Sequence, residues 1–248
     1  MLSKIKQGAP LIHCITNYVA ANFSANGLLA VGASPIMADE IKEVAEVVSS
    51  AEGLLINIGT VNDCTMKSML VAGIKANELD IPVVLDPVGV GATDYRKKVV
   101  LRLLKEVRFS LIRCNAGELA AIAGEEWQVK GVDSGEGILN PSTIAQKVAL
   151  EYECLVAVTG KTDYVTNGQA EYTINGGNET TTHITGTGCL LSAICTASLA
   201  SSNKEEDLEV LAATLKDYKH AAELSTDKAG SFAVEFMNNL QKIAEVSK

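Results

Sequence analysis

The stretch His183-Ile184-Thr185-Gly186-Thr187-Gly188-Cys189-Leu190-Leu191-Ser192-Ala193 is the most informative part of the chain. Its Gly-Thr-Gly sequence permits a tight turn. It leads directly into an apolar run, Cys189–Ala200, that has helical spacing and contains neither Pro nor Gly. The first turn of a helix carries unpartnered N–H groups and the positive end of the dipole, so it can bind phosphate or a developing anion. Many helices follow a glycine turn for packing reasons alone, and the stretch by itself favours that interpretation.

The composition limits the classes of protein to which the chain can belong. It has 248 residues, of which 47% are hydrophobic and only 4% aromatic, so a large core has to be built from Ala, Val, Ile and Leu. A net charge of −9 and the absence of a Lys/Arg-rich stripe argue against nucleic-acid binding. No apolar run approaches the roughly 18 residues that span a membrane, and no apolar signal region is seen near Met1. We therefore expect a cytoplasmic protein without membrane or nucleic-acid partners.

The six cysteines are scattered singly along the sequence and form no C-x-x-C pair. Their spacing to His183 and His220 does not match that of zinc ligands. In a cytosolic protein such cysteines are mostly buried free thiols. We expect this for all of them except Cys189.

Short apolar segments alternate with longer helical ones along the chain. This alternation predicts one α/β domain over residues 1–248, with a mostly parallel central sheet and helices on both faces. The predicted strands are Leu11–Ile15, Ser34–Met37, Leu54–Ile58, Val83–Leu85, Ser110–Arg113 and Leu155–Val158, with a hairpin from Tyr164–Val165 and Gln169–Ile174 around Asn167-Gly168. The predicted helices are Ala20–Val31, Ile41–Ser50, Asn62 or Asp63 to Leu79, Tyr95–Lys105, one through Leu119 and Ile122 to Gly124, Asn140 or Pro141 to Glu151, Leu208–Ser225 and Ser231–Val246.

Ligands of such sheets bind at the carboxyl ends of the strands, and three polar residues near these ends stand out. Asp86 closes an apolar strand before a glycine-rich loop, and Asn115 and Glu118 lie three apart at the start of a helix. Oxygen ligands of this kind can hold Mg²⁺, with substrate phosphates completing the shell. The alternatives are structural, because Asp86 can form a turn and Asn115 and Glu118 can form a capping box.

The familiar nucleotide and hydrolase motifs are missing. The chain has no G-x-x-x-x-G-K-[ST] loop, no G-x-G-x-x-G fingerprint at an early strand and no G-x-S-x-G elbow. Taken together, its motifs resemble those of the ribokinase-like superfamily of small-molecule kinases and, more closely, those of the hydroxyethylthiazole kinases of thiamine salvage. The matching stretches cover almost the whole chain: Pro10–Asn17, Asn22-Phe23, Ala33–Ala38, Asn57–Thr60, Val84–Gly91, Ile112–Gly124, Ala157–Asp163 and His183–Ser192.

The resemblance implies a ribokinase-like fold and a defined reaction. The γ-phosphoryl group of ATP would pass, with Mg²⁺, to the primary hydroxyl of 4-methyl-5-(2-hydroxyethyl)thiazole. It also implies a homotrimer that binds the thiazole between neighbouring subunits. The site residues that it implies are Met37, Asn17 and Gly186 for the thiazole, Arg113, Thr159 and Asn115 for ATP, Asp86 and Glu118 for the metal and phosphate shell, and Gly186, Thr187 and Gly188 for the anion hole.

Cys189 stands where the wider superfamily carries the Asp that acts as the presumed base. A free thiol has a pKa of about 8.5; the helix N-terminus should lower this value and the triphosphate should raise it. Phosphoryl transfer demands little activation of the nucleophile. We therefore expect Cys189 to be a catalytic residue that acts as a weak base or positions the acceptor, and not a covalent nucleophile.

Two other functions remain open from the sequence. One is a related kinase that acts on a pyrimidine or pyridoxal-type alcohol, and the other is a non-catalytic nucleotide sensor. The mixed polar segment Glu125–Asn140 is predicted to be a surface excursion, either without a role or acting as a flap.

Overall fold

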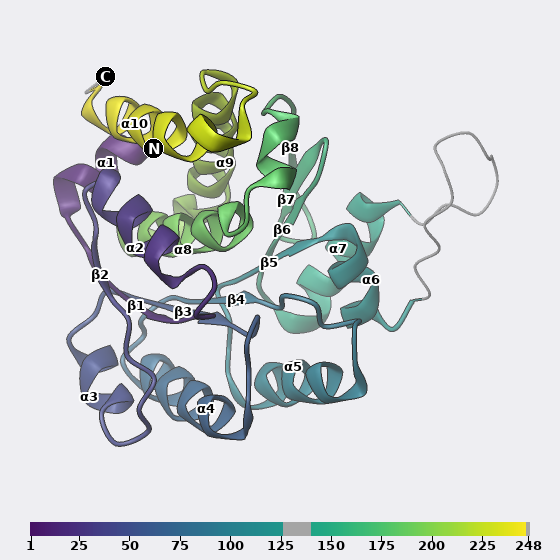
Figure 1. The fold of residues 1–248 in the computed structure, drawn as a ribbon. Coiled ribbons are helices and arrows are strands. Elements are labelled where there is room, and N and C mark those ends of the chain that lie inside the picture. The colour runs from purple at the N-terminus through teal and green to yellow at the C-terminus, as the bar shows by residue number, and fades with distance from the viewer. Residues whose placement is uncertain (126–139, 247–248) are drawn as a thin grey trace.

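One eight-stranded sheet runs through the computed structural model, which describes residues 1–125 and 140–246 (Figure 1). Its strands lie in the order β2-β1-β3-β4-β5-β6-β7-β8, and β1 to β6 pair in parallel, whereas β7 and β8 are antiparallel. The predicted, mostly parallel sheet is therefore confirmed. The strands are β1 Leu11–Ile15, β2 Ser34–Ile36, β3 Gly53–Asn57, β4 Val83–Asp86, β5 Leu111–Asn115, β6 Leu155–Thr159, β7 Asp163–Thr166 and β8 Glu171–Ile174.

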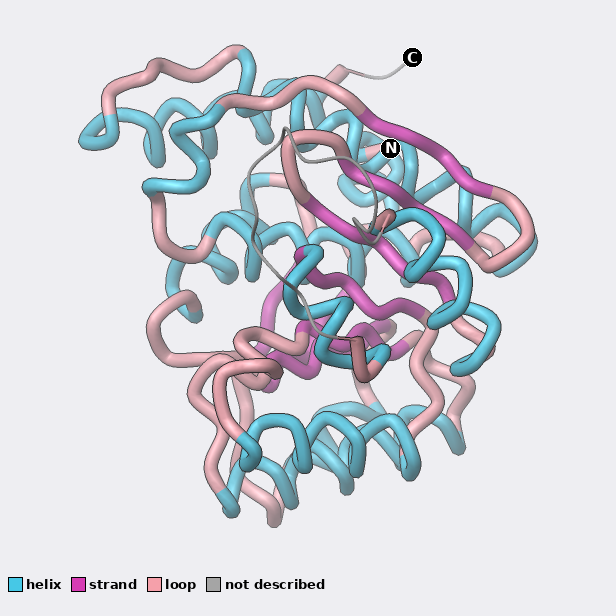
Figure 2. Tube along the Cα trace, turned by 90° about the vertical axis from the view of Figure 1, so that its right-hand side faces the viewer, coloured by secondary structure: helices cyan, strands magenta, loops and turns pink. Residues whose placement is uncertain are grey.

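Helices cover both faces of the sheet, as the alternating pattern predicts (Figures 1 and 2). Side chains alternate along each strand, so that Leu55 belongs to one hydrophobic core whereas Leu54 and Ile56 belong to the other. One core contains α1 Leu2–Gly8, α2 Ala21–Ala30, α8 Thr187–Ala200, α9 Asp207–Glu223 and α10 Ala229–Glu245. The other contains α3 Val44–Ser49, α4 Asp63–Glu78, α5 Asp94–Glu106, α6 Ala116–Ala123 and α7 Pro141–Tyr152.

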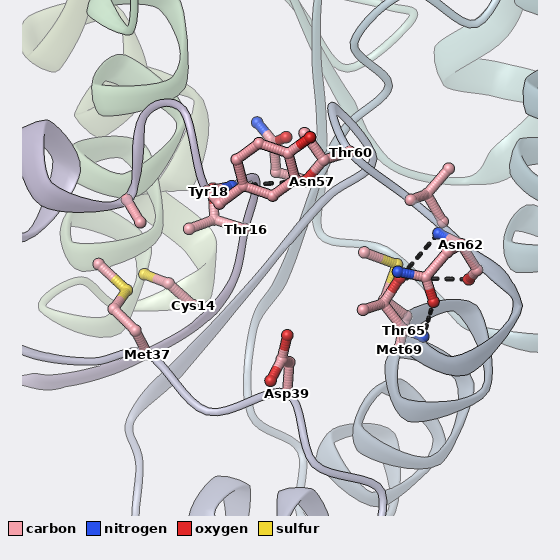
Figure 3. Close-up of a pocket in the computed structure, with 12 residues that line it drawn as sticks. Cys14, Thr16, Tyr18, Met37, Asp39, Asn57, Thr60, Asn62, Thr65 and Met69 are labelled. Carbon is pink, nitrogen blue, oxygen red and sulfur yellow. Dashed lines mark hydrogen bonds between the residues drawn. The ribbon is translucent and has the colours of Figure 1, made fainter.

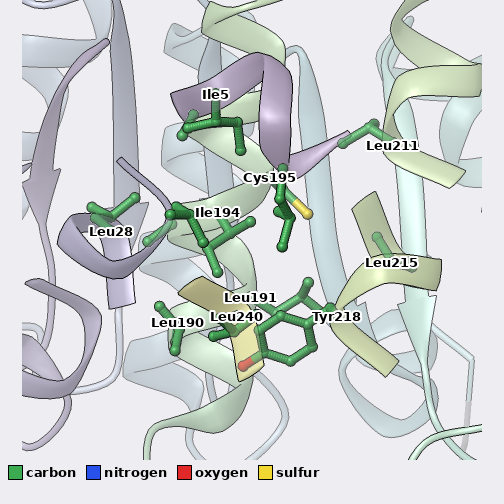
Figure 4. Packing of buried hydrophobic residues seen from close by; sticks show 14 of the residues in the cluster. Ile5, Leu28, Leu190, Leu191, Ile194, Cys195, Leu211, Leu215, Tyr218 and Leu240 are labelled. Atoms are coloured by element: carbon green, nitrogen blue, oxygen red, sulfur yellow. The ribbon is translucent and has the colours of Figure 1, made fainter. Parts of the chain in front are cut away.

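Helix α8 lies at the centre of the first core and contains no charged residue (Figure 4). A helix that is apolar or small on every side is stable only when other elements surround it. Here α2, α9 and the strands β1, β3 and β4 do so. The approach to α2 is close, since a Cβ on Gly27 would lie 2.1 Å from Leu190 Cδ1. This packing fixes the direction of α8 and therefore the place of its N-terminus, which begins at the Gly186–Gly188 turn.

Some local predictions need correction. The helix predicted at Ile41–Ser50 begins only at Val44, because residues 41–43 form a turn. Helix α1 was not predicted, although its buried Leu2 and Ile5 are spaced as on one helix face. The β7–β8 connection has four residues, 167–170, and not two.

The cysteines and the apolar segments bear on the remaining sequence predictions. All six cysteines are free; Cys64 is exposed, contrary to expectation, and Cys189 is half-buried. Of the segment Glu125–Asn140, residues 126–139 lie outside the described residues. Within the ranges 1–125 and 140–246, no helix is both long and apolar enough to cross a membrane.

Candidate active site

A continuous hydrogen-bonded chain connects the strand ends to the start of α8. Asn17 Nδ2 donates to Cys189 Sγ at 3.2 Å and to Asn57 Oδ1 at 2.9 Å. Asn57 Nδ2 in turn donates to Asp86 Oδ2 at 2.7 Å. Ser192, one turn into α8, also donates to Asp86 Oδ2, at 2.9 Å. Residues from β3, β4, the segment after β1 and α8 are therefore held in one buried polar group.

The Gly-Thr-Gly turn has the geometry of a helix start. Gly186 has φ of 94°, a left-handed value that favours glycine, and it is the N-cap of α8. The Thr187 side chain bonds back to the carbonyls of Thr181 and Ile184, and Tyr218 donates its hydroxyl to the Thr187 carbonyl at 2.5 Å. These contacts hold the turn in place. The first N–H groups of any helix have no intrahelical acceptors, and in α8 these groups belong to the turn.

Arg113 packs directly against this turn. A Cβ on Gly188 would lie 2.9 Å from Arg113 Nη1, so the absence of a side chain at Gly188 allows the guanidinium to approach. Arg113 Nη2 donates to Thr159 Oγ1 at 2.5 Å, and Nη1 lies 3.8 Å from Asp86 Oδ1. Arg113 and Thr159, two of the residues predicted to bind ATP, are therefore in contact at the ends of β5 and β6.

Asp86 is completely buried at the end of β4. Burial raises the pKa of this carboxyl to about 6, while the charge of Arg113 opposes the shift and that of Glu118 adds to it. Burial alone would lower the pKa of Arg113, but the charges of Asp86 and Glu118 outweigh it and raise that pKa. The Asp86 Oδ1 and Arg113 Nε atoms have no hydrogen-bond partner among the described residues. Each charge of the pair therefore favours the ionised form of the other, and the pair has unused polar atoms.

The structure resolves the sign of the pKa shift at Cys189. Burial raises the pKa of the Cys189 thiol, and the charge of Asp86 raises it further, while Asn17, Asn57 and Arg113 act in the opposite direction. The sulfur is therefore a neutral thiol at pH 7.

Asn115 and Glu118 form the capping box that the sequence left as an alternative. Asn115 Oδ1 accepts the Glu118 N–H and Glu118 Oε2 accepts the Asn115 N–H, both at 2.9 Å. Glu118 Oε1 also accepts the N–H of Gly89 at 3.0 Å, which ties the loop after β4 to α6. Glu118 is partly exposed, whereas Asp86 is buried. Across the described part of the chain, no group of three His, Cys, Asp or Glu side chains could hold a metal ion.

A small cavity opens beside the polar chain (Figure 3). Its volume of about 200 Å³ is below the roughly 300–1,000 Å³ of typical drug-sized ligand sites. The sulfur-bearing side chains of Met37 and Cys14 lie at one end, and the capped start of α4, at Asn62, lies at the other. Asn57 lines the cavity and contacts Asn17. Met37 and Asn57 thus line the same cavity, and Asn57 is hydrogen-bonded to Asn17, which contacts Cys189.

Sequence reasoning missed three residues of the site. Asn57 and Ser192 complete the buried chain, and Arg96 donates to the carbonyls that follow β3 and β4: Ile58, Gly59 and Val88, at 2.7–2.8 Å. The signal for Asn57 was its polar character at the end of an apolar strand. Nothing in the local sequence marks Arg96 or Ser192, because each acts through a partner distant in the chain.

The comparisons with known proteins agree over nearly the full length. The model of the hydroxyethylthiazole kinase family matches residues 2–246. A hydroxyethylthiazole kinase from Lysinibacillus sphaericus is 55% identical over 244 residues, covering 97% of this chain and 95% of that protein. The solved structure of the hydroxyethylthiazole kinase of Pyrococcus horikoshii matches with a TM-score of 0.89 at 36% identity, covering 98% and 92% of the two chains. A ribokinase-like superfamily protein from Enterococcus faecalis shares the fold, with a TM-score of 0.67 at 9% identity and coverage of 99% and 90%.

Proposed function

The chain belongs to the hydroxyethylthiazole kinase family, and we propose that it carries out phosphoryl transfer on the Gly186–Cys189 turn. The reaction is that of the family: the chain phosphorylates 4-methyl-5-(2-hydroxyethyl)thiazole, with ATP as co-substrate, in thiamine salvage. The ribokinase-like fold predicted from the sequence agrees with this assignment.

The contact between Arg113 and the turn is the observation that carries the proposal. A guanidinium and a helix N-terminus are both positive, and here they are packed together in a largely buried place. The carboxylate of Asp86 compensates the charge of the Arg113 guanidinium. An anion bound at the turn would remove the remaining repulsion between Arg113 and the helix N-terminus and would accept hydrogen bonds from the N–H groups of the turn. A transferring phosphoryl group is such an anion. Arg113 and Thr159 hold the phosphates on one side, and Asn115 borders them at the start of α6.

The acceptor lies on the other side of the turn. Met37 contacts the thiazole ring in the small cavity, Asn17 orients the hydroxyethyl arm, and Gly186 lets the arm approach the turn without a side chain in the way. Support comes from the Asn17–Cys189 contact and from the Asn57 side chain, which joins Asn17 to the cavity. A cavity of this size suits a single substituted ring.

Mg²⁺ fits the carboxyl groups of this site, with ATP phosphates as further ligands. Glu118 offers a partly exposed carboxylate, and Asp86 has an orphaned buried oxygen, Oδ1. Glu118 would hold the ion through its oxygens or through water, and Asp86 would add negative charge from beneath. When bound, Mg²⁺ supplies neutralisation of the charge that develops on the phosphate oxygens.

Cys189 positions the acceptor hydroxyl, and its thiolate form takes the hydroxyl proton late in the transfer and becomes the thiol. Only a minor fraction of Cys189 is thiolate at pH 7, but the loose transition state of phosphoryl transfer needs little activation of the nucleophile. Catalysis then rests on orientation and on the positive turn, to which Arg113 adds its charge.

Replacing Cys189 by Asp is expected to preserve or raise kcat at pH 7, because a carboxylate there is ionised where the thiol is not. The wild-type kcat should increase as the pH rises above 7 toward the raised pKa of the thiol, whereas the Cys189→Asp profile should be flat over that range. Steady-state kinetics between pH 6.5 and 9, with circular dichroism as a folding control, measures both. Abolished turnover in a folded Cys189→Asp protein, or a phospho-enzyme detected by intact mass, would refute this role.

The chain works as a homotrimer whose sites lie between subunits, in the cytoplasm. Support for an interface comes from the rim of the cavity, where Tyr18 is 82% exposed and the adjoining Val19 is 60% exposed. The free cysteines fit a reducing compartment. Sedimentation equilibrium of the purified protein should give three times the mass of one chain, and a monomer with full activity would rule out shared sites.

An assay over a panel of alcohols tests the proposed acceptor. With ATP and Mg²⁺, hydroxyethylthiazole should give the phosphate ester and one ADP per ester, while pyridoxal-type and hydroxymethylpyrimidine alcohols should react far more slowly. Preference for one of these would favour the related kinase instead. ATP binding without ADP formation with any acceptor would favour a nucleotide sensor.

A further inference from the structure

One lysine outside the predicted site is surrounded by oxygen atoms. Lys219, on α9, places its Nζ 3.1 Å from the Asp163 Oδ1, 3.2 Å from the Gly160 carbonyl, 3.4 Å from the Lys161 carbonyl and 3.1 Å from the Gly176 carbonyl. Its side chain is 11% exposed and that of Asp163 only 4%. An ammonium group has three N–H donors, fewer than these four oxygens. It therefore acts here as a compact point charge and not through directional bonds alone.

The four oxygens come from two neighbouring segments at one end of the β7–β8 pair, where Asp163 pairs with Ile174. Gly160 and Lys161 belong to the connection between β6 and β7, Asp163 begins β7, and Gly176 follows β8. These oxygens carry partial or full negative charge, and the ammonium group offsets the repulsion among them. The Asp163 Oδ1 also accepts the N–H of Gly160 at 2.9 Å, which folds the first loop around the lysine.

A second side chain on the same face of α9 binds the segment that follows β8. Glu223, four residues further along α9, accepts the N–H of Gly177 at 2.9 Å. Residues four apart lie on one side of a helix. The last turns of α9 thus hold the segment after β8 by two adjacent side chains.

The first loop begins directly after Thr159, the residue that contacts Arg113. We propose that the Lys219 ammonium group is a built-in cation that positions the β6–β7 loop, and with it Thr159, for nucleotide binding. This inference rests on the proposed function, in which Thr159 lies on the ATP side of the turn. Lys219 is a positioning residue, since it acts on ATP through the backbone of Gly160.

Removing the ammonium group while leaving the oxygens tests this directly. In Lys219→Ala, the KM for ATP should rise by about tenfold or more when tetramethylammonium is the only monovalent cation, because Thr159 is no longer held in place. Replacing tetramethylammonium by potassium or ammonium at equal ionic strength should restore most of the loss, because these ions can take the place of Nζ. The KM for hydroxyethylthiazole should change little. The wild-type response to the same exchange is the reference.

Two matched variants separate a cation site from general damage. Lys219→Met fills the space without charge, so its KM for ATP should rise and potassium should not restore it. Lys216→Ala removes an exposed lysine from the same helix and should resemble the wild type. A readout independent of turnover is the melting temperature, which potassium should raise in Lys219→Ala and leave unchanged in Lys219→Met.

The outcomes are distinct. The inference would be overturned if the KM for ATP of Lys219→Ala were unchanged, or if potassium and ammonium did not lower it below its value in tetramethylammonium. A Lys219→Ala protein that folds in potassium but not in tetramethylammonium supports it, and one that folds in neither contradicts it. Failure of the proposed function would show separately, as wild-type protein that makes no ADP with hydroxyethylthiazole, and it leaves the melting-temperature test in place.

Discussion

Replacing Arg113 by Met should lower kcat/KM for ATP by about three orders of magnitude. Removing one donor aimed at a developing anion costs on the order of 10²–10³ in rate, and Arg113 offers both a charge and the contact to Thr159. The loss should appear mainly with ATP, because the thiazole side of the turn keeps Asn17 and Met37. Steady-state kinetics with each substrate varied in turn measures this difference.

The same substitution should also destabilise the fold. Arg113→Met leaves the buried Asp86 without its counter-charge, and breaking a buried pair in this way costs about 3–5 kcal/mol. Adding Asp86→Asn removes the uncompensated charge while keeping the shape of the side chain. The double variant should therefore regain stability in urea unfolding and remain inactive. A double variant that also regains activity would contradict the role of Arg113 at the phosphates.

Replacing Gly188 by Ala should reduce kcat by about a hundredfold. The new Cβ would lie 2.9 Å from Arg113 Nη1 and 3.2 Å from Nη2, so the guanidinium has to move off the turn. A misplacement of roughly 1 Å at a reacting centre costs about 10² in rate. Alanine is otherwise preferred over glycine in a helix, and Gly188 does not have a left-handed φ.

Gly230 provides the control for this prediction. It also lies near the start of a helix, α10, and a Cβ there would meet nothing within 4 Å. Gly230→Ala should keep the wild-type kcat and melting temperature. If Gly188→Ala retained wild-type kcat, Arg113 would have no part in catalysis through the turn.

The fold could be predicted from the sequence because its signals are local. Apolar runs of strand length, helical spacing and strand-end residues specify a parallel sheet without reference to distant contacts. Helix α8 is the clearest case, since the Gly186 turn and the uncharged run after it mark both its start and its burial. Local signals are weaker where a short turn precedes a helix, and α3 was accordingly predicted to begin too early.

The polar network could be predicted only in part, because it depends on contacts between distant segments. Asp86 was predicted as a strand-end residue and Arg113 was implied by the family resemblance, but no sequence signal indicated that they pair with each other. Ser192 lies 106 residues from its partner Asp86, and its place within an apolar helix looks like simple packing. Lys219 was missed for the same reason, since its oxygens come from two loops and most of them belong to the backbone. The net pKa shift of Cys189 also required the burial that only the structure provides.

The Gly186–Cys189 turn is expected to receive the transferring phosphoryl group. A crystal structure of the protein with ADP, aluminium fluoride, Mg²⁺ and hydroxyethylthiazole would locate that group, because the fluoride complex imitates the phosphoryl group during transfer. We expect the fluoride on the N–H groups of the turn, with Arg113 on the ADP side and the thiazole hydroxyl next to Cys189 Sγ. Fluoride bound away from the turn, or a thiazole hydroxyl remote from Cys189, would contradict this expectation.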